Sequence, residues 1–186
     1  MCRPCLRLLR AALIWDDEVL PEPGLHALFR MTPPLLSLIH GFKYRHYRRH
    51  IRFLCAYLRY RPAFVEALGK PDVLVPVPLH SARRRERGYN QAAALADALA
   101  EAIAAPRLAG ALTRVRSTRA QARLGPAERR RNIAGAFRVE RPAAMKGRSV
   151  LLVDDVMTTG ATLESALAAL AAAGAVATGV TLAWAS

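Results

Sequence analysis

Residues 150–162 constrain the fold more than any other part of the chain. They read Val-Leu-Leu-Val-Asp-Asp-Val-Met-Thr-Thr-Gly-Ala-Thr. The four apolar residues, flanked by charge, predict a buried strand of a parallel sheet whose carboxyl end carries Asp154 and Asp155. Residues 161–173 are rich in alanine and leucine and contain no proline, which predicts a helix. The order strand, acid pair, turn and helix predicts an α/β fold.

The turn between this strand and this helix is a predicted anion site. The amino end of a helix offers free N–H groups and a partial positive charge. Gly160 lets the backbone approach a phosphate closely, and Thr158, Thr159 and Thr162 add hydroxyl donors. The adjacent carboxylates would repel a phosphate unless they faced sugar hydroxyls or Mg²⁺, so the pattern predicts a phosphorylated-sugar site. Solvated carboxylates beside an ordinary helix cap are the alternative, which suits an isolated acid pair better than this complete pattern.

A second loop is expected at the same edge of the sheet. Residues 73–77 are short and apolar, and Pro76 and Pro78 close the run, which predicts a strand that ends in a rigid loop. In open α/β sheets ligands bind outside the carboxyl ends of the strands, so this loop and the acid pair could face one pocket. The donors or cations that follow are His80, Arg83, Arg84 and Arg87. The alternative is a turn histidine and a solvated basic helix start.

Residues 114–132 predict a mobile surface loop. The segment is strongly basic, holds one glycine and one proline, and lacks any core-forming period. A mobile basic loop suits a lid over an anionic ligand, and Arg119 and Gln121 are the candidates for contacts in the closed state. A solvated charged connection is the alternative.

Residues 150–162 resemble the phosphoribosyl-pyrophosphate (PRPP) motif of the type I phosphoribosyltransferases. More narrowly, the run from about residue 38 to residue 186 resembles the ComF family, phosphoribosyltransferase-like proteins associated with bacterial competence. Six segments carry the narrower resemblance, in the order that the family shows them: Ile-His-Gly-Phe-Lys-Tyr at 39–44, the strand and loop at 73–80, residues 84–91 ending in Arg-Gly-Tyr-Asn-Gln, Thr-Arg-Ala-Gln at 118–121, Arg-Arg-Arg-Asn at 129–132 and Gly-Ala-Phe at 135–137.

The resemblance implies a type I phosphoribosyltransferase fold, a parallel twisted sheet flanked by helices, with a small helical hood over residues 38 to about 60 and a flexible loop. It also implies Mg²⁺ as cofactor and the following roles. Asp154 and Asp155 would meet the ribose hydroxyls and hold Mg²⁺, directly or indirectly, and with Arg119 they are the expected catalytic residues. The 5-phosphate would lie on Thr158, Thr159, Gly160, Ala161 and Thr162, and the pyrophosphate on Pro78, Leu79, His80, Arg87 and Gln121.

The chain divides into an N-terminal extension, residues 1–37, and a phosphoribosyltransferase-like domain, residues 38–186. With 186 residues and 53% hydrophobic content, it can bury a full core. Many ComF proteins carry an amino-terminal four-cysteine zinc finger, but here Cys2 and Cys5 have no second pair and Cys55 stands alone. We therefore expect no zinc and interpret residues 1–37 as a remnant of that region; a site shared across a dimer is the alternative.

We expect a cytoplasmic protein without a membrane segment. Arg7 and Arg10 interrupt the first apolar run, which argues against a signal peptide. Residues 165–186 contain no charge and are long enough to raise the question of a membrane span. Their alanine content and the interrupting Gly174 and Gly179 instead predict a helix end, a turn and a final buried strand over residues 176–184.

The net charge of +14, from 25 arginines and three lysines against 14 acidic residues, predicts an anionic partner. Basic clusters at 43–52 and 129–131 could attract a nucleic-acid backbone without reading its sequence. A solvated helix face, the needs of an anionic small substrate and genomic base composition are alternative explanations. His46 and His50 have a spacing suited to metal, but no carboxylate lies near them in the sequence, so we expect no metal there.

The sequence leaves the acceptor of the phosphoribosyl group open, with a nucleobase as one candidate, and it leaves a homodimer open. A second function is a non-catalytic PRPP sensor or DNA-associated competence factor, with non-specific DNA and competence proteins such as a helicase as partners. A third is a nucleic-acid adaptor without affinity for PRPP. Neutralising Asp154 and Asp155 should abolish PRPP binding under the first two hypotheses and change nothing under the third.

Overall fold

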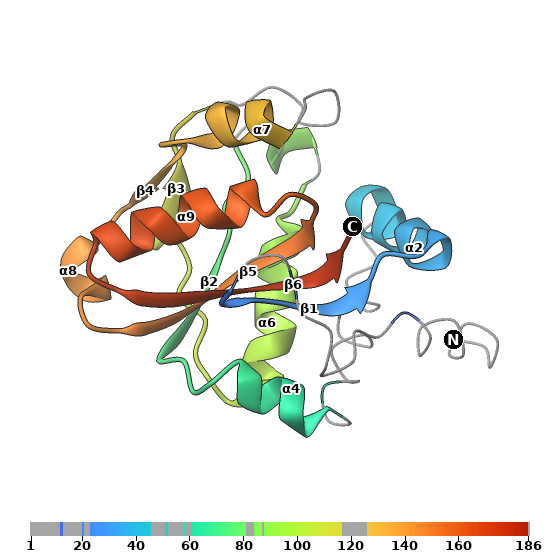
Figure 1. The fold of residues 1–186 in the computed structure, drawn as a ribbon, viewed down its shortest axis with the longest axis horizontal. Helices are drawn as coiled ribbons and strands as arrows, with labels where there is room; N and C mark the ends of the chain where they lie inside the picture. The colour runs from blue at the N-terminus through green and yellow to red at the C-terminus, as the bar shows by residue number, and fades with distance from the viewer. Residues whose placement is uncertain are drawn as a thin grey trace.

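A parallel β-sheet forms the centre of the molecule (Figure 1). The computed structural model describes residues 12, 20, 23–45, 51, 58, 61–80, 84–86, 88–116 and 126–185. Within these ranges four parallel strands are ordered β1-β6-β5-β2. Their bounds are Leu25–Arg30 for β1, Val73–Pro76 for β2, Ser149–Met157 for β5 and Val176–Trp184 for β6. The sheet and its flanking helices confirm the predicted α/β fold.

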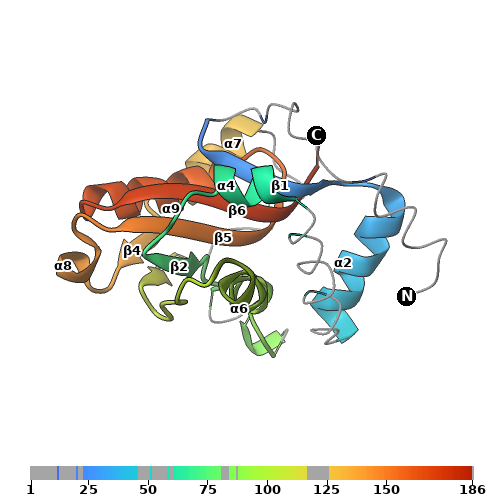
Figure 2. The same cartoon turned by 90° about the horizontal axis from the view of Figure 1, so that it is seen from below.

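Helices cover both faces of this sheet (Figures 1 and 2). On one face, α6 (Gln91–Ile103) and α2 (Pro33–Arg45), which overlaps the start of the predicted hood, bury Leu95, Leu99, Leu35 and Ile39 in one apolar cluster. The helix α4 (Pro62–Ala67) adds Phe64 to it. On the other face, α9 (Ala161–Ala172) buries its leucines in a second cluster. The sheet is therefore the middle layer of three.

The central strand β5 is apolar on both faces because it lies between the two clusters. Leu151 and Val153 belong to the cluster under α6, whereas Val150 and Leu152 belong to the cluster under α9. All four side chains are at most 1% exposed. This alternation explains why a strand with period-two side chains has a continuous apolar sequence.

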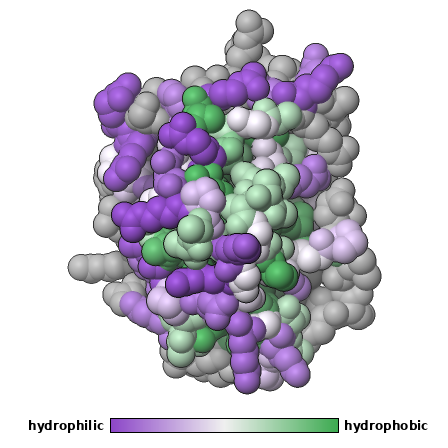
Figure 3. Space-filling model, turned by 90° about the vertical axis from the view of Figure 1, so that its left-hand side faces the viewer, coloured by the Kyte–Doolittle hydropathy of each residue, from purple (hydrophilic) through white to green (hydrophobic). Residues whose placement is uncertain are grey.

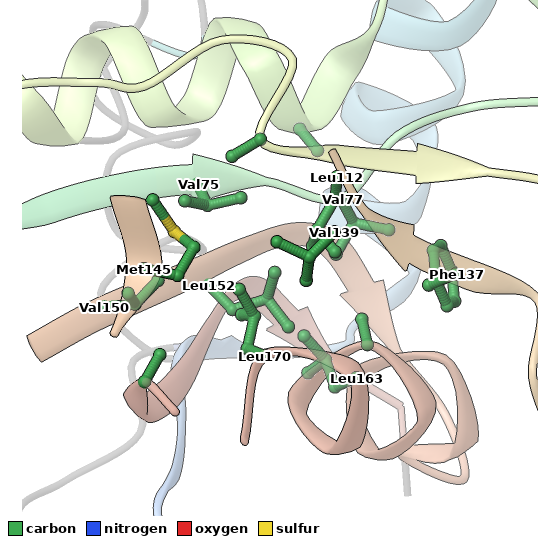
Figure 4. Close-up of a cluster of buried hydrophobic side chains, with 14 of the residues drawn as sticks. Val75, Val77, Leu112, Phe137, Val139, Met145, Val150, Leu152, Leu163 and Leu170 are labelled. Atoms are coloured by element: carbon green, nitrogen blue, oxygen red, sulfur yellow. The ribbon is translucent and has the colours of Figure 1, made fainter. Parts of the chain in front are cut away.

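A small antiparallel pair, β3 (Leu112–Arg114) with β4 (Phe137–Val139), packs against α9 (Figure 4). These strands flank the predicted loop. The prediction of a loop as far as residue 132 is wrong, because Pro126–Ile133 form the helix α7. Ile133 is buried in the α9-side cluster, and its carbonyl accepts a hydrogen bond from Ser165 Oγ at 2.8 Å. This apolar anchor lies one residue beyond the predicted loop. The short helix α8 (Pro142–Met145) follows β4.

The edge strand β1 was not predicted from the sequence. It pairs with β6 and places Leu25 opposite Gly179, more than 150 residues along the chain. The sheet thus extends into the segment assigned to residues 1–37, and the predicted division at residue 38 falls inside α2. Strand β6 coincides with the predicted final strand, residues 176–184. Nowhere in the described ranges does a helix combine the length and apolar character that a membrane span requires.

Candidate functional site

The acid pair lies inside β5 rather than after it. The strand continues to Met157, four residues beyond the predicted apolar run. Consecutive side chains of a strand point to opposite faces, so Asp154 and Asp155 diverge. Asp154 borders a small hollow at the amino end of α9, whereas Asp155 does not. The two carboxylates are both partly buried but face different surroundings.

Local backbone hydrogen bonds orient both carboxylates. The Asp155 N–H donates to Asp154 Oδ1, and the Val156 N–H donates to Asp155 Oδ1, each at 2.8 Å. Each bond restricts the orientation of its carboxylate, and an ionised carboxylate can accept about four hydrogen bonds in all.

The turn after β5 forms what we call the phosphate hollow. Its volume is about 40 Å³. It is lined by Asp154, Val156, Met157, Thr158, Thr159, Gly160, Ala161, Thr162 and Leu163. It combines a carboxylate, hydroxyl donors and the first turn of a twelve-residue helix. A hollow of this size suits one small anionic group, not a complete phosphorylated sugar.

Gly160 gives the hollow its shape. Its φ of +76° lies in the left-handed region, which favours glycine. A Cβ atom at this position would lie 3.2 Å from Glu164 Oε1 and 3.6 Å from Leu25 Cδ1. The Gly160 carbonyl accepts the Glu164 N–H at 2.9 Å, which starts the helix. The missing side chain thus leaves room for Glu164 and Leu25 beside the turn that lines the hollow.

The second predicted loop, residues 78–80, begins at the same edge of the sheet. The Val77 N–H donates to the Val153 carbonyl at 2.8 Å, so the β2–β5 pairing continues to the residue before Asp154. Asn90 fixes the loop from the other side: its Nδ2 donates to the Val77 carbonyl at 2.9 Å, and its Oδ1 caps α6 by accepting the Ala92 N–H at 3.1 Å. Hydrogen bonds therefore fix the backbone both where the chain leaves β2 and where it enters α6.

The two loops share an edge but not one cavity. Pro78, Leu79 and His80 are partly buried, and none of them borders the phosphate hollow. Arg84 lines a separate groove along α6, where Asp97 forms an ion pair with Arg107. Several predicted site residues, Arg83, Arg87, Arg119 and Gln121, lie outside the described residues, as do Cys2, Cys5, His46, His50 and Cys55. Their predicted roles stay predictions.

Asp154 and Asp155 are the kind of ligand that Mg²⁺ uses. In the part of the chain that the structure describes, no three histidine, cysteine or acidic residues lie close enough to enclose a metal ion. Mg²⁺ usually keeps several waters and is held by one or two carboxylates together with substrate phosphates. Asp154 and Asp155 are two carboxylates near the carboxyl end of β5, so their chemistry fits a site of this kind.

Sequence reasoning missed two supports of this site. The first is Leu25 on β1, which touches the position that a Gly160 side chain would take. Turn residues Pro-Glu-Pro-Gly at 21–24, followed by a mostly apolar run, are the signal that could have predicted this strand. The second is Asn90, whose place just before an alanine-rich helix is typical of a helix cap.

Comparisons with known proteins agree with this architecture. Residues 66–185 match the family model described as "Phosphoribosyl transferase domain". The chain is 35% identical over 164 residues to "DNA utilization protein YhgH" of Salmonella typhi, covering 86% of this chain and 68% of that protein. It is 35% identical over 169 residues to "Competence protein F" of Haemophilus influenzae, covering 86% and 69%, and 33% identical over 163 residues to the YhgH protein of Escherichia coli K12, covering 86% and 68%.

Proposed function

This chain belongs to the ComF family of the type I phosphoribosyltransferase superfamily, and we propose that it binds PRPP with Mg²⁺ and transfers the 5-phosphoribosyl group to an acceptor. One observation carries the proposal: Asp154 and the amino end of α9 border the same phosphate-sized hollow. An acidic group and an anion site in contact suit a ligand that presents hydroxyls and a phosphate together.

Each part of PRPP has a complementary element at this edge. The 5-phosphate would accept hydrogen bonds from backbone N–H groups and threonine hydroxyls of residues 158–162. The ribose hydroxyls would donate to Asp154 and Asp155. The pyrophosphate would lie toward residues 78–80, whose backbone starts beside the strand position before Asp154. Arg87, Arg119 and Gln121 are further proposed contacts for this group.

The transfer needs charge stabilisation but no covalent enzyme intermediate. The acceptor's lone pair would form a bond to the anomeric carbon while the bond from that carbon to pyrophosphate breaks, and the bonding electrons leave with the pyrophosphate. Positive charge grows on the ribose ring, where Asp154 and Asp155 would stabilise it, and arginines would stabilise the departing anion. Mg²⁺, when bound by the acid pair, would neutralise negative charge on the pyrophosphate.

The relatives' names support a second candidate within the same family. They refer to DNA utilization and to competence, and the chain's net charge of +14 favours an anionic macromolecule as partner. A protein of this kind could use PRPP as a signal, without efficient transfer, while associating with DNA. Release of pyrophosphate in the presence of an acceptor, with nucleobases tested first, distinguishes the enzyme from the sensor.

The first test is calorimetric titration of PRPP, with and without Mg²⁺, into the wild-type protein and two aspartate variants. Asp154→Asn should weaken Mg²⁺-dependent binding about tenfold or more, because it removes a charged group from the hollow. Asp72→Asn is the matched control. Asp72 lies at the opposite, amino edge of the sheet, where its Oδ2 accepts the Ser149 N–H at 2.8 Å, a bond that an asparagine oxygen can still accept.

We expect Asp72→Asn to bind PRPP as the wild type does. If the folded wild-type protein fails to bind PRPP, both the transferase and the sensor proposals are wrong. If Asp154→Asn and the wild type bind equally well, the ligand lies elsewhere. Circular dichroism of all three proteins checks that each is folded.

A further inference from the structure

Thr181 carries a buried hydroxyl that the proposed chemistry has not yet used. The residue lies in β6 and is 1% exposed. Its Oγ1 makes no hydrogen bond, which is rare for a buried hydroxyl in a folded protein. A threonine that served only to fill space would be replaced with advantage by valine, because an unsatisfied buried hydroxyl destabilises the fold. The position therefore calls for an explanation beyond packing.

The sheet register places this hydroxyl beside Asp154. Thr181 is the β6 partner of Asp154, and neighbouring strands lie about 4.8 Å apart. Gly179 lies two residues earlier in β6, and a Cβ there would lie 3.5 Å from Leu163 of α9. Because every second side chain of a strand points to the same face, the Thr181 side chain also points toward α9. Asp154 faces the same side, since it borders the hollow at the start of α9.

We propose that the Thr181 hydroxyl is a positioning group that holds the Asp154 carboxylate in its ligand-binding orientation. The inference rests on the proposed function and deepens it. Asp154 Oδ1 accepts the Asp155 N–H, and a carboxylate has room for further donors. When sugar hydroxyls or Mg²⁺ draw the Asp154 side chain toward the ligand, the carboxylate becomes the acceptor that Thr181 lacks in the free protein. Ligand binding then satisfies a group that folding leaves unsatisfied.

This arrangement makes a prediction that a structural role does not. If Thr181 acts only through its shape, the isosteric Thr181→Val variant keeps full ligand affinity. If the hydroxyl acts on Asp154, the same variant loses affinity while its stability stays equal to, or rises above, that of the wild type. Thr181→Ser keeps the hydroxyl and removes only a methyl group, so it should restore binding.

The experiment is titration of PRPP with Mg²⁺ into the wild type, Thr181→Val, Thr181→Ser and a control, Thr178→Val. Thr178 lies in the same strand, three residues earlier, in register with Leu151 and away from the hollow. We expect Thr181→Val to bind about five- to tenfold more weakly, as for the loss of one hydrogen bond, and Thr181→Ser to stay within about twofold of the wild type. The control should bind as the wild type does.

Two results overturn the inference while leaving the proposed function intact: Thr181→Val binding as tightly as the wild type, or Thr181→Ser binding as weakly as Thr181→Val. A wild-type protein that does not bind PRPP overturns the proposed function and this inference with it. A crystal structure of the wild-type PRPP complex gives an answer that does not depend on how the variants fold. Thr181 Oγ1 should then lie within hydrogen-bond distance, about 3 Å, of an Asp154 carboxylate oxygen, and a clear separation overturns the inference.

Discussion

Gly160 is the single backbone position on which the phosphate hollow depends most directly. Its φ is +76°, and a Cβ would approach Glu164 Oε1 to 3.2 Å. We expect Gly160→Ala to lower the free energy of unfolding by about 1–2 kcal/mol, because an L residue is strained in the left-handed region. The added methyl also presses on Glu164 and Leu25 and so disturbs the turn that lines the hollow, which should lower the affinity for PRPP. Urea unfolding and calorimetry measure the two effects.

Gly110 provides the matched control for this substitution. Its φ of +71° is nearly the same, but a Cβ there would have no heavy atom within 4 Å. Gly110→Ala should therefore show the backbone cost alone, with PRPP affinity unchanged. The interpretation of the hollow is wrong if Gly160→Ala binds PRPP as well as Gly110→Ala does.

His26 links stability to pH at one residue of β1. Its ring is partly buried and makes an edge contact with Phe64, with the ring centroids 6.3 Å apart. Burial lowers the pKa of His26 below its ordinary value of 6.5, because desolvation disfavours the charged imidazolium. As the pH falls below 6.5, the unfolded chain therefore binds this proton more readily than the folded protein, and stability is lost.

We expect His26→Phe to flatten this dependence, since phenylalanine keeps an aromatic ring beside Phe64 but cannot take up a proton. Urea unfolding at about pH 5 and about pH 8 measures the difference in stability for each protein. The wild type should lose more stability on acidification than the variant. Equal losses in the two proteins would show that His26 does not carry the effect.

At the scale of elements, the packing of β1 against β6 and α9 supports the turn that lines the phosphate hollow. Gly179 in β6 leaves room for Leu25 of β1, whose Cδ2 would lie only 2.7 Å from a Cβ at this position. Gly179→Ala forces Leu25 to move, which should cost about 1–3 kcal/mol of stability. Leu25 also touches the Gly160 position, so PRPP affinity should fall as well.

A double-mutant cycle tests this explanation. Leu25→Ala removes the side chain that the new methyl would meet, so the cost of Gly179→Ala should be smaller in the Leu25→Ala background than in the wild type. Denaturant unfolding of the four proteins gives the coupling. Additive costs would mean that Gly179 is needed for some reason other than room for Leu25.

The elements that the sequence predicted well are those specified by local patterns. Residues 150–153 are apolar on both faces, and 161–172 are rich in helix formers, so β5 and α9 could be recognised without any partner. Strand β1 was missed because its local signal is weaker: only the turn residues at 21–24 mark its start, and Leu25 finds its partner at Gly179, far along the chain. The helix α7 was missed because its side-chain anchor, Ile133, is a single apolar residue at the end of a basic segment.

The same difference between local patterns and long-range contacts applies to the candidate site. Asp154 and residues 158–162 are adjacent in the sequence, so their meeting around one hollow followed from a strand, a turn and a helix. The divergence of Asp154 and Asp155 depended on how far β5 extends, which the apolar run does not show. Thr181 became a candidate only through the β5–β6 register, a contact between positions 27 residues apart.

At the scale of the whole molecule, positive charge is not confined to the edge that carries the phosphate hollow. Figure 3 shows the side of the molecule where α8 lies, with hydrophilic side chains over much of the surface. Arg141, Lys146 and Arg148 are exposed there, next to the start of β5. Nearby, Glu140 forms an ion pair with Arg138. The amino edge of the sheet thus offers a basic surface separate from the acid pair.

This separation predicts that DNA and PRPP bind independently. If the net charge of +14 serves a nucleic-acid partner, binding of a fluorescent DNA duplex should weaken steeply with salt and show no sequence preference. Combined alanine substitution of Arg141, Lys146 and Arg148 should weaken DNA binding and reduce the slope of log affinity against log salt by about two to three, the value for three lost phosphate contacts. The triple variant should bind PRPP as the wild type does, whereas Asp154→Asn should lose affinity for PRPP and keep its affinity for DNA. Fluorescence anisotropy measures DNA binding and calorimetry measures PRPP binding of the same two variants. Competition between PRPP and DNA, or an unchanged salt slope in the triple variant, would mean that DNA binds at another surface. If no DNA binds at any salt concentration, the positive charge serves the anionic small substrate instead.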